Sequence, residues 1–210
     1  MNWAASFEHH LFASSAHSVA GVARVVGAVL AAGSGTRMGS PKAVLRVGGA
    51  RLVDRAVAAL IDGGCASVLA VVRSGTDVPH ARVLVNDDPE RGMRSSLALA
   101  VDAADGDALA VLLVDTPGVS AEAIRAVVAT WRLDRVTVAT YRAQRGHPTV
   151  MSGELWRVAL TMAGPDEGAR AFLASRPDLV DEVPVDGDPT DLDSPDDVAH
   201  WDTLNRPDRP

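Results

Sequence analysis

The junction between an apolar run and a glycine-rich stretch near the start of the chain places the strongest constraint on its fold. The apolar run from Arg24 to Leu30 has the pattern of a strand that is buried on both faces of a sheet. The glycine-rich stretch from Gly33 to Gly39 follows almost at once. Glycines there let backbone N–H groups approach a ligand closely, and such groups bind phosphate oxygens. The sequence therefore predicts a central strand with a phosphate-binding loop at its carboxyl end.

The rest of the chain alternates β-branched runs with segments of helical periodicity. Strands are expected at residues 67–72, 82–85, 109–114, 135–140, 148–151 and 179–185. Helices are expected at residues 52–61, 93–104 and 120–131, and three more should open at Ser152, Asp166 and Pro195. This order predicts an α/β, three-layer Rossmann-like fold around a mostly parallel mixed sheet, with ligands at the carboxyl ends of the strands.

The length of 210 residues favours one domain, which we place at residues 22–204. Residues 1–21 are interpreted as a disordered leader, and residues 205–210 as a flexible tail. A net charge of −7 argues against general binding to nucleic acid or to an anionic membrane. No apolar stretch is long enough to span a bilayer. A single cysteine, Cys65, excludes an intramolecular disulfide and favours a cytoplasmic location.

The glycine loop does not fit two well-known phosphate-binding patterns. Position 38 is Met where the dinucleotide fingerprint needs Gly, and Lys42 follows Pro41 where a P-loop needs Gly before Lys. Lys42 is the one lysine among 20 basic residues. Together with Arg37 it gives the loop two cations, which suit a triphosphate bound outside a P-loop.

Three aspartates are candidates for a magnesium site. Asp115 ends a predicted buried strand, where its carboxylate reaches the ligand crevice. Asp191 and Asp193 have the i, i+2 spacing that puts both side chains on one face of an extended segment. Mg²⁺ prefers one or two carboxylates together with phosphate oxygens and water. The sequence leaves open which of Asp191 and Asp193 is the second ligand.

The loop Leu-Ala-Ala-Gly-Ser-Gly-Thr-Arg-Met-Gly-Ser-Pro-Lys, residues 30–42, resembles the signature of nucleotidyltransferases. It is most similar to the molybdenum cofactor cytidylyltransferases (MocA-like) of the MobA-like NTP transferase superfamily. Further matching blocks follow in the family's order: Asn86 with residues 92–97, then residues 115–119, 146–148, 166–170 and 191–197. Thr116 and Pro165 depart from the family's usual residues.

The resemblance implies a nucleotidyltransferase fold, and transfer of CMP from CTP to molybdopterin with release of pyrophosphate. It implies that Arg37, Lys42 and Asp115 are catalytic and that Mg²⁺ is the cofactor. The implied nucleotide-binding residues are Leu30, Ala31, Ala32, Gly33, Ser34, Gly35, Thr36, Arg37, Lys42, Asn86, Gly92, Ser95, Ser96 and Asp115. The implied acceptor-binding residues are Thr116, Pro117, His147 and Arg170. Transient contact with a molybdoenzyme or its chaperone is also implied.

Several alternatives remain open on sequence grounds. The acceptor could be another phosphorylated molecule, such as a sugar phosphate, or the chain could be a non-catalytic chaperone for the molybdenum cofactor. A dinucleotide-dependent oxidoreductase is disfavoured by Met38 and by Arg73, which stands where an acidic residue is expected after the second strand. Nucleotidyl transfer needs no general base, because a phosphate monoester is mostly dianionic at neutral pH.

Overall fold

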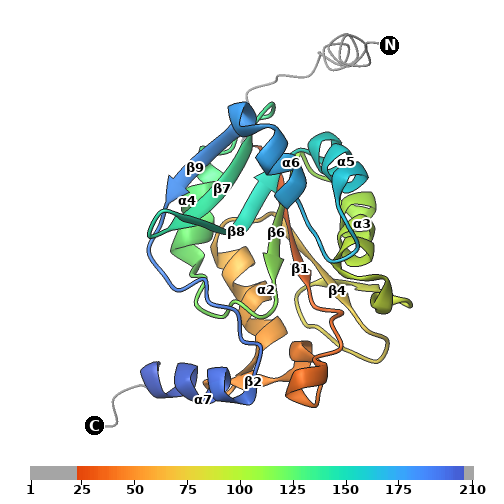
Figure 1. Cartoon of the computed structure of the whole chain (residues 1–210), viewed down its shortest axis with the longest axis vertical. Helices are drawn as coiled ribbons and strands as arrows, with labels where there is room; N and C mark the ends of the chain where they lie inside the picture. Colours follow the sequence, from red (N-terminus) through yellow and green to blue (C-terminus); the bar gives the residue numbers. More distant parts are fainter. Residues whose placement is uncertain (1–22, 206–210) are drawn as a thin grey trace.

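The central feature of the computed structural model, which describes residues 23–205, is one seven-stranded sheet (Figure 1). Its strand order is β5-β4-β1-β6-β8-β7-β9. The strands are β1 (Val25–Leu30), β4 (Ser67–Val72), β5 (Arg82–Val85), β6 (Ala108–Leu113), β7 (Val136–Tyr141), β8 (Gln144–Met151) and β9 (Val180–Pro184). All neighbours are parallel except β8, which is antiparallel to both β6 and β7. The sheet is therefore mixed and mostly parallel, as predicted.

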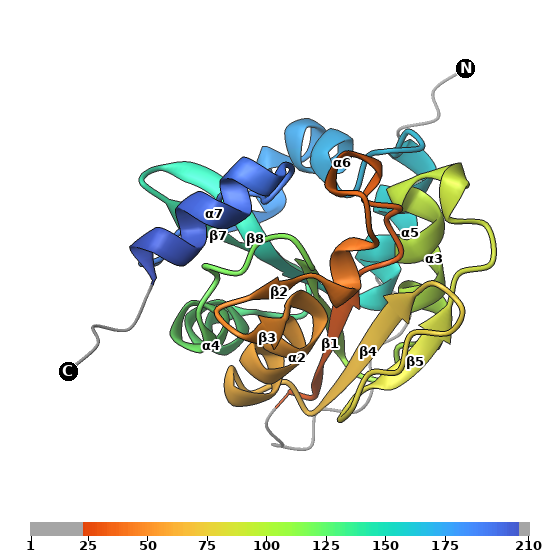
Figure 2. The ribbon, with the colours of Figure 1, turned by 90° about the horizontal axis from the view of Figure 1, so that it is seen from below.

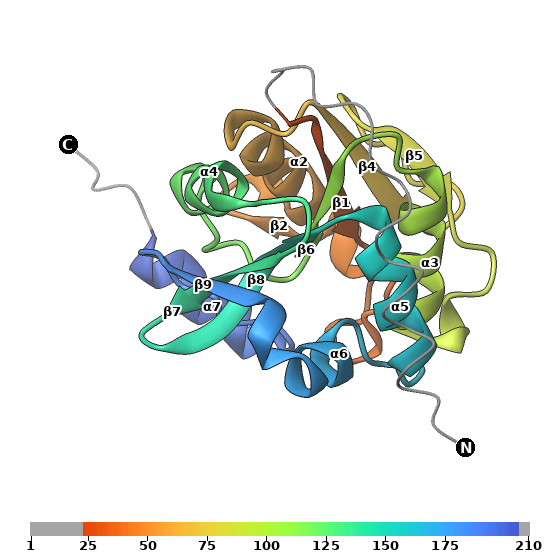
Figure 3. The same ribbon diagram turned by 90° about the horizontal axis from the view of Figure 1, so that it is seen from above.

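Helices cover both faces of the sheet and make three layers (Figure 3). On one face lie α2 (Leu52–Asp62) and α4 (Ala121–Thr130); on the other lie α3 (Met93–Ala103), α5 (Gly153–Met162) and α6 (Arg170–Ser175). Successive β1 residues alternate between these faces, because Val29 packs in the core cluster with Leu60 and Val26 packs in the cluster with Leu97. Both faces of β1 are thus buried, which explains its uninterrupted apolar run and confirms the predicted fold class.

Local sequence signals fix most element starts. Ser120 and Ser152 cap α4 and α5, with each side-chain oxygen accepting from a backbone N–H three residues on. The helix expected at Asp166 instead begins at Arg170. The preceding residues form a separate turn, in which the Glu167 N–H donates to the Gly164 carbonyl.

The strand predicted at residues 148–151 is shorter than the observed β8. The strand covers Gln144–Met151 and pairs with β7 through a turn at Arg142 and Ala143, whose φ values are 50° and 65°. Neither residue is the Gly or Asn that usually marks such a turn, so the hairpin gave no local signal in the sequence.

A small hairpin and the last helix lie at the carboxyl-end side of the main sheet (Figure 2). Strands β2 (Arg46–Val47) and β3 (Ala50–Arg51) form the hairpin, and α7 (Pro195–Leu204) packs on it. The Gly48 N–H in the hairpin turn donates to Asp202 Oδ1 of α7 at 2.9 Å. Within residues 23–205 the structure also has four short 3-10 turns: η1 (Thr36–Met38), η2 (Lys42–Val44), η3 (Pro89–Arg91) and η4 (Pro177–Leu179).

The predicted leader at residues 1–21 and most of the predicted tail lie outside the described residues. Within residues 23–205, no helix has the length and hydrophobicity that a bilayer crossing requires.

Candidate active site

The glycine loop leaves β1 in a conformation that requires glycine at one position. Gly35 has φ +59°, and a Cβ there would lie 2.1 Å from the Ser40 carbonyl oxygen. The Met38 N–H closes the turn by donating to the Gly35 carbonyl at 2.8 Å. The N–H groups of Gly33, Ser34 and Gly35 donate to no other described residue. The loop therefore presents consecutive backbone donors that suit an anion.

Arg73 holds this loop against the sheet, a role that the sequence did not reveal. It follows β4 directly, and its Nε donates to the Ala32 carbonyl at 2.9 Å. Its guanidinium also forms an ion pair with Glu90 of η3 at 2.6 Å. The position of Arg73 directly after a buried strand was the one available signal, and it pointed to the carboxyl edge of the sheet rather than to a particular contact.

Lys42 lies at the end of the loop between two carboxylates. Its Nζ donates to Asp115 Oδ2 at 2.7 Å and to Asp193 Oδ1 at 2.5 Å. Its side chain is only 15% exposed, so burial opposes the charge, but the two carboxylates outweigh burial and raise the pKa of Lys42. The ammonium group is therefore charged at neutral pH and neutralises part of an acidic cluster.

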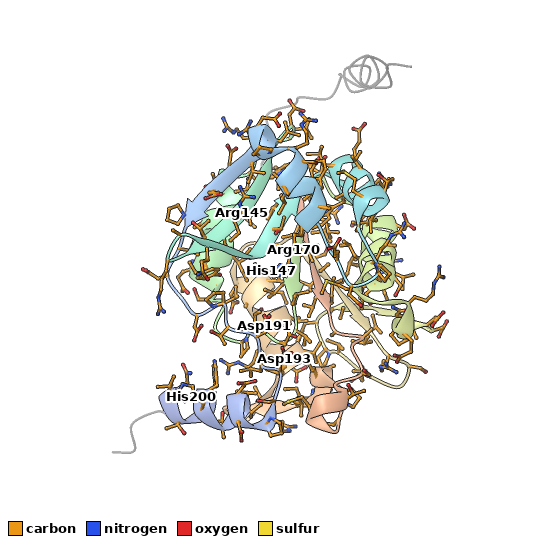
Figure 4. The ribbon with its side chains drawn as sticks, in the orientation of Figure 1. Arg145, His147, Arg170, Asp191, Asp193 and His200 are labelled. Carbon is orange, nitrogen blue, oxygen red and sulfur yellow. The ribbon has the colours of Figure 1, made fainter. Side chains whose placement is uncertain are left out.

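The segment that carries the other two aspartates lies against the end of β6. The Leu192 N–H donates to the Asp115 carbonyl at 2.9 Å, which brings Asp191 and Asp193 to the site (Figure 4). Burial, followed by the nearby charges of Asp115 and Asp193, raises the pKa of Asp191. The structure thus brings all three predicted carboxylates to one place.

The donor set fits a divalent cation, although Lys42 holds two of the three carboxylates here. Asp115 Oδ1 is buried and has no hydrogen-bond partner among the described groups. A buried, unpaired carboxylate oxygen is unfavourable and suits a hard cation such as Mg²⁺. In the described part of the chain, no three His, Cys, Asp or Glu side chains are arranged so that they could already hold a metal ion. The metal-binding roles of Asp115, Asp191 and Asp193 stay predictions.

Asn86 organises the start of α3 through its own hydrogen bonds. Its Nδ2 donates to Ser95 Oγ at 2.9 Å and to Ser96 Oγ at 3.0 Å, while its Oδ1 accepts from the Asp88 N–H. Gly92, with φ +87°, is packed so closely on the Pro165 carbonyl that a Cβ would lie 2.3 Å from that oxygen. These groups shape the wall beside the glycine loop, and their predicted contact with a nucleotide remains untested.

Two of the predicted acceptor residues line a cavity of about 650 Å³. His147 and Arg170 line it together with Asp191. Figure 4 labels these three residues on the ribbon. His147 Nδ1 lies 3.2 Å from the Val111 carbonyl, and burial lowers the pKa of His147. The ring is therefore neutral at pH 7 and donates from Nδ1. Arg145 lines the same cavity but is paired with Glu182 at 2.7 Å.

The other two predicted acceptor residues lie elsewhere. Thr116 is 4% exposed, and its hydroxyl donates to the Leu113 carbonyl at 2.9 Å. Thr116 and Pro117 line a different cavity, which Leu112 of β6 also lines. The turn after Asp115 carries these two residues away from His147 and Arg170, so the structure does not join the four predicted acceptor residues into one site.

The remaining loop residues are only partly described. Thr36 and Arg37 belong to η1, and the Arg37 side chain lies outside the described part of the structure. Leu30 lines the 650 Å³ cavity at the end of β1. Ala31 is buried and donates its N–H to the Val71 carbonyl at 2.8 Å, so it is part of the sheet edge.

Comparison with known proteins adds a family match and one curated relative. The family described as the MobA-like NTP transferase domain matches residues 27–181. Nicotine blue oxidoreductase of Paenarthrobacter nicotinovorans is 35% identical over 186 residues, which are 80% of this chain and 91% of that protein.

Solved structures share the same architecture. A nucleotidyl transferase from Methanothermobacter thermautotrophicus has a TM-score of 0.72 and 22% identity, with coverage of 87% of this chain and 99% of that one. The 2-C-methyl-D-erythritol 4-phosphate cytidylyltransferase of Thermus thermophilus has a TM-score of 0.65 and 22% identity, with coverage of 86% and 98%. At these identities the likeness establishes the fold.

Proposed function

Because the chain belongs to the family of MobA-like NTP transferase domains, we propose that it transfers CMP from CTP to the phosphate of molybdopterin. In this reaction a phosphate oxygen of the acceptor forms a bond to the α-phosphorus of CTP, and the bond to the β-phosphate bridge breaks. Pyrophosphate leaves with the electron pair of that bond. The observation that carries the proposal is the position of Lys42, between Asp115 and Asp193 at the end of an anion-binding glycine loop.

The residues on the nucleotide side supply position and charge. The N–H groups at Gly33, Ser34 and Gly35 donate to no acceptor in the described part of the chain, so they can bind oxygens of the triphosphate. Lys42 supplies a fixed positive charge for the charge that grows on the leaving pyrophosphate. Asp115, with Asp191 or Asp193, would hold Mg²⁺, which when bound neutralises phosphate charge.

The residues on the acceptor side supply a binding cavity rather than a base. Arg170 offers a cation for the acceptor phosphate, and neutral His147 offers its second ring nitrogen, Nε2. The acceptor phosphate is already mostly dianionic near pH 7 and attacks without prior deprotonation. Delivery of the product to a molybdoenzyme or its chaperone would follow release from this cavity.

The test is pyrophosphate release from CTP, GTP, ATP and UTP, each with and without molybdopterin. The proposal expects release that requires molybdopterin and is fastest with CTP. Release with methylerythritol phosphate or another sugar phosphate, and not with molybdopterin, would assign a different acceptor. Binding of the molybdenum cofactor without any pyrophosphate release would favour the chaperone. Dominant GTP product would contradict the choice of CTP.

The 35% identical relative, which is named as an oxidoreductase, favours a second candidate function. The same backbone donors and cavity could hold the pyrophosphate and a ring of a nicotinamide dinucleotide. The test of this oxidoreductase activity mixes the chain with NADH or NADPH and an aromatic electron acceptor, without any NTP. Loss of absorbance at 340 nm reports oxidation of the dinucleotide and distinguishes this activity from nucleotidyl transfer. A chain that oxidises the dinucleotide and releases no pyrophosphate would replace the first candidate by the second.

A further inference from the structure

A second cavity lies on the other face of β6 from the proposed acceptor site. Its volume is about 440 Å³, and Leu112 and Val114 line it, whereas Val111 and Leu113 line the first cavity. Because side chains alternate along a strand, the two cavities lie on opposite sides of the sheet. The proposed transfer reaction makes no use of the second cavity.

Arg55 is the charged residue among those that line this cavity, and its guanidinium has no hydrogen-bond acceptor among residues 23–205. The group lies over the Trp201 ring, 4.8 Å from its centroid. Its Nε is buried and has no hydrogen-bond partner, and no described carboxylate forms an ion pair with it. Stacking on Trp201 fixes the guanidinium but leaves its N–H donors unused. A half-buried cation in this state is a ready site for an anion.

Two other polar side chains of the cavity form hydrogen bonds within the protein. Ser120 Oγ accepts from the Ala123 N–H, and Asn205 Nδ2 donates to the Trp201 carbonyl. The remaining walls are mostly apolar and come from α2, from β6 with the turn after it, and from the start of α4: Leu52, Ala56, Ala58, Ala59, Leu112, Val114, Pro117, Val119 and Ala121. The cavity therefore offers one positive charge within apolar and aromatic surroundings.

We propose that this cavity binds a small aromatic carboxylate. A planar guanidinium pairs with a carboxylate through two parallel hydrogen bonds, and one positive charge matches one negative charge. A phosphate dianion would keep about half of its charge unpaired here, because the site has no second cation. The ring of the ligand would pack on the alanines of α2 and on the edge of Trp201. The ligand would also touch Val114 and Thr116, the two neighbours of Asp115.

The test is a nitrogen–proton correlation NMR titration of the full chain with naphthalene carboxylate, and in parallel with its neutral amide. The proposal expects saturable shifts at the Trp201 indole N–H and at the backbone of Ala56 and Val119. The carboxylate should bind at least tenfold more tightly than the amide, because a hydrogen bond between charged partners contributes about that much to affinity. Arg55→Gln should remove that difference, and Arg157→Gln, on exposed α5 surface across the sheet, should keep it.

Three results would overturn the proposal: no saturable shift at the cavity, equal affinity for carboxylate and amide, or full carboxylate affinity in Arg55→Gln. Should Arg55→Gln fail to fold, the comparison of the two ligands on the unmodified chain decides alone. Because CTP is absent from every titration, the outcome is independent of the proposed transferase activity.

Discussion

The two halves of the sheet build the candidate site in different ways. In the half made of β5, β4, β1 and β6, all strands are parallel, so their carboxyl ends meet at one edge and place the glycine loop beside Asp115. In the half made of β8, β7 and β9, the antiparallel β8 brings His147 to the cavity from within a strand. The first half supplies fixed charges and backbone donors, and the second supplies a cavity wall.

This difference separates the expected effects of mutations. Changes in the parallel half should alter the chemical step or the use of CTP. Changes in the half around β8 should alter only the binding of the acceptor.

The largest effect is expected for Asp115→Asn. The amide removes the charge that would hold Mg²⁺, and it also leaves Lys42 with one carboxylate fewer. The rate of pyrophosphate release should fall roughly 1,000-fold, at the upper end for loss of one preorganised electrostatic group, with an unchanged melting temperature. Rate assays at saturating CTP and molybdopterin measure this. A variant that keeps its Mg²⁺ dependence and rate would show that Asp115 is only a turn residue.

Lys42→Met should lower the rate of pyrophosphate release roughly 100-fold, because it also removes one preorganised charge. It should also raise the affinity for Mn²⁺ in the absence of nucleotide about tenfold, because the ammonium no longer competes for Asp115 and Asp193. Electron paramagnetic resonance of unbound Mn²⁺ measures that affinity directly. Unchanged or weaker metal binding would mean that Lys42 and the metal do not share these oxygens.

Gly35→Ala should raise the KM for CTP and lower stability by about 1–3 kcal/mol, because the new Cβ meets the Ser40 carbonyl in a strained backbone conformation. The matched control is Gly39→Ala in the same loop, where φ is +71° but a Cβ would meet nothing within 4 Å. Thermal melts and CTP saturation curves compare the two. Equal effects would show that backbone strain, and not the close contact, requires glycine at position 35.

Arg170→Gln tests the other half of the sheet. It should raise the KM for molybdopterin about tenfold through loss of a charged contact and leave the KM for CTP unchanged. Arg145→Gln is the comparison, since Arg145 lines the same cavity but is already paired with Glu182. A rise in the KM for CTP in either variant would break the division between the halves.

The smallest effect is expected for Ala32→Gly. Ala32 is 2% exposed and its carbonyl is held by Arg73, so its methyl can narrow a base pocket only indirectly. Because the methyl acts only indirectly, the preference for CTP over GTP should loosen by less than the roughly 10- to 200-fold of a direct apolar contact, and it should not reverse. The ratio of dinucleotide products from equal CTP and GTP measures it. A reversed ratio would place base selection at this residue.

The parallel half was predictable from the sequence because its signals are local. The apolar runs gave β4 and β5 with their observed bounds and β1 within a residue, and serine caps located α4 and α5. The sequence also predicted that Lys42 and Asp115 lie at the same edge of the sheet. It could not distinguish Asp193, which pairs with Lys42, from Asp191, which lines the acceptor cavity, because both lie on the same extended segment.

Features in both halves that depend on long-range contacts or on very short elements were harder to predict. The β7–β8 turn has no glycine, and the β2–β3 hairpin has strands of two residues, too short for any periodicity. The cavity that Thr116 and Pro117 line depends on how the chain turns after β6. The positions of these two residues in the sequence do not reveal that turn. The contact between Arg55 and Trp201 joins residues far apart in the sequence, so no local pattern predicts it.

The ion pair between Lys42 and Asp193 spans 151 positions of the chain. During synthesis the amino-terminal part leaves the ribosome first, so the glycine loop and β6 can form before Asp193 exists. Until the segment after β9 arrives and docks through Leu192 and Asp202, Lys42 has only half of its carboxylate partners. A nascent chain can thus hold a complete sheet and still lack the finished charge arrangement, which the segment after β9 completes.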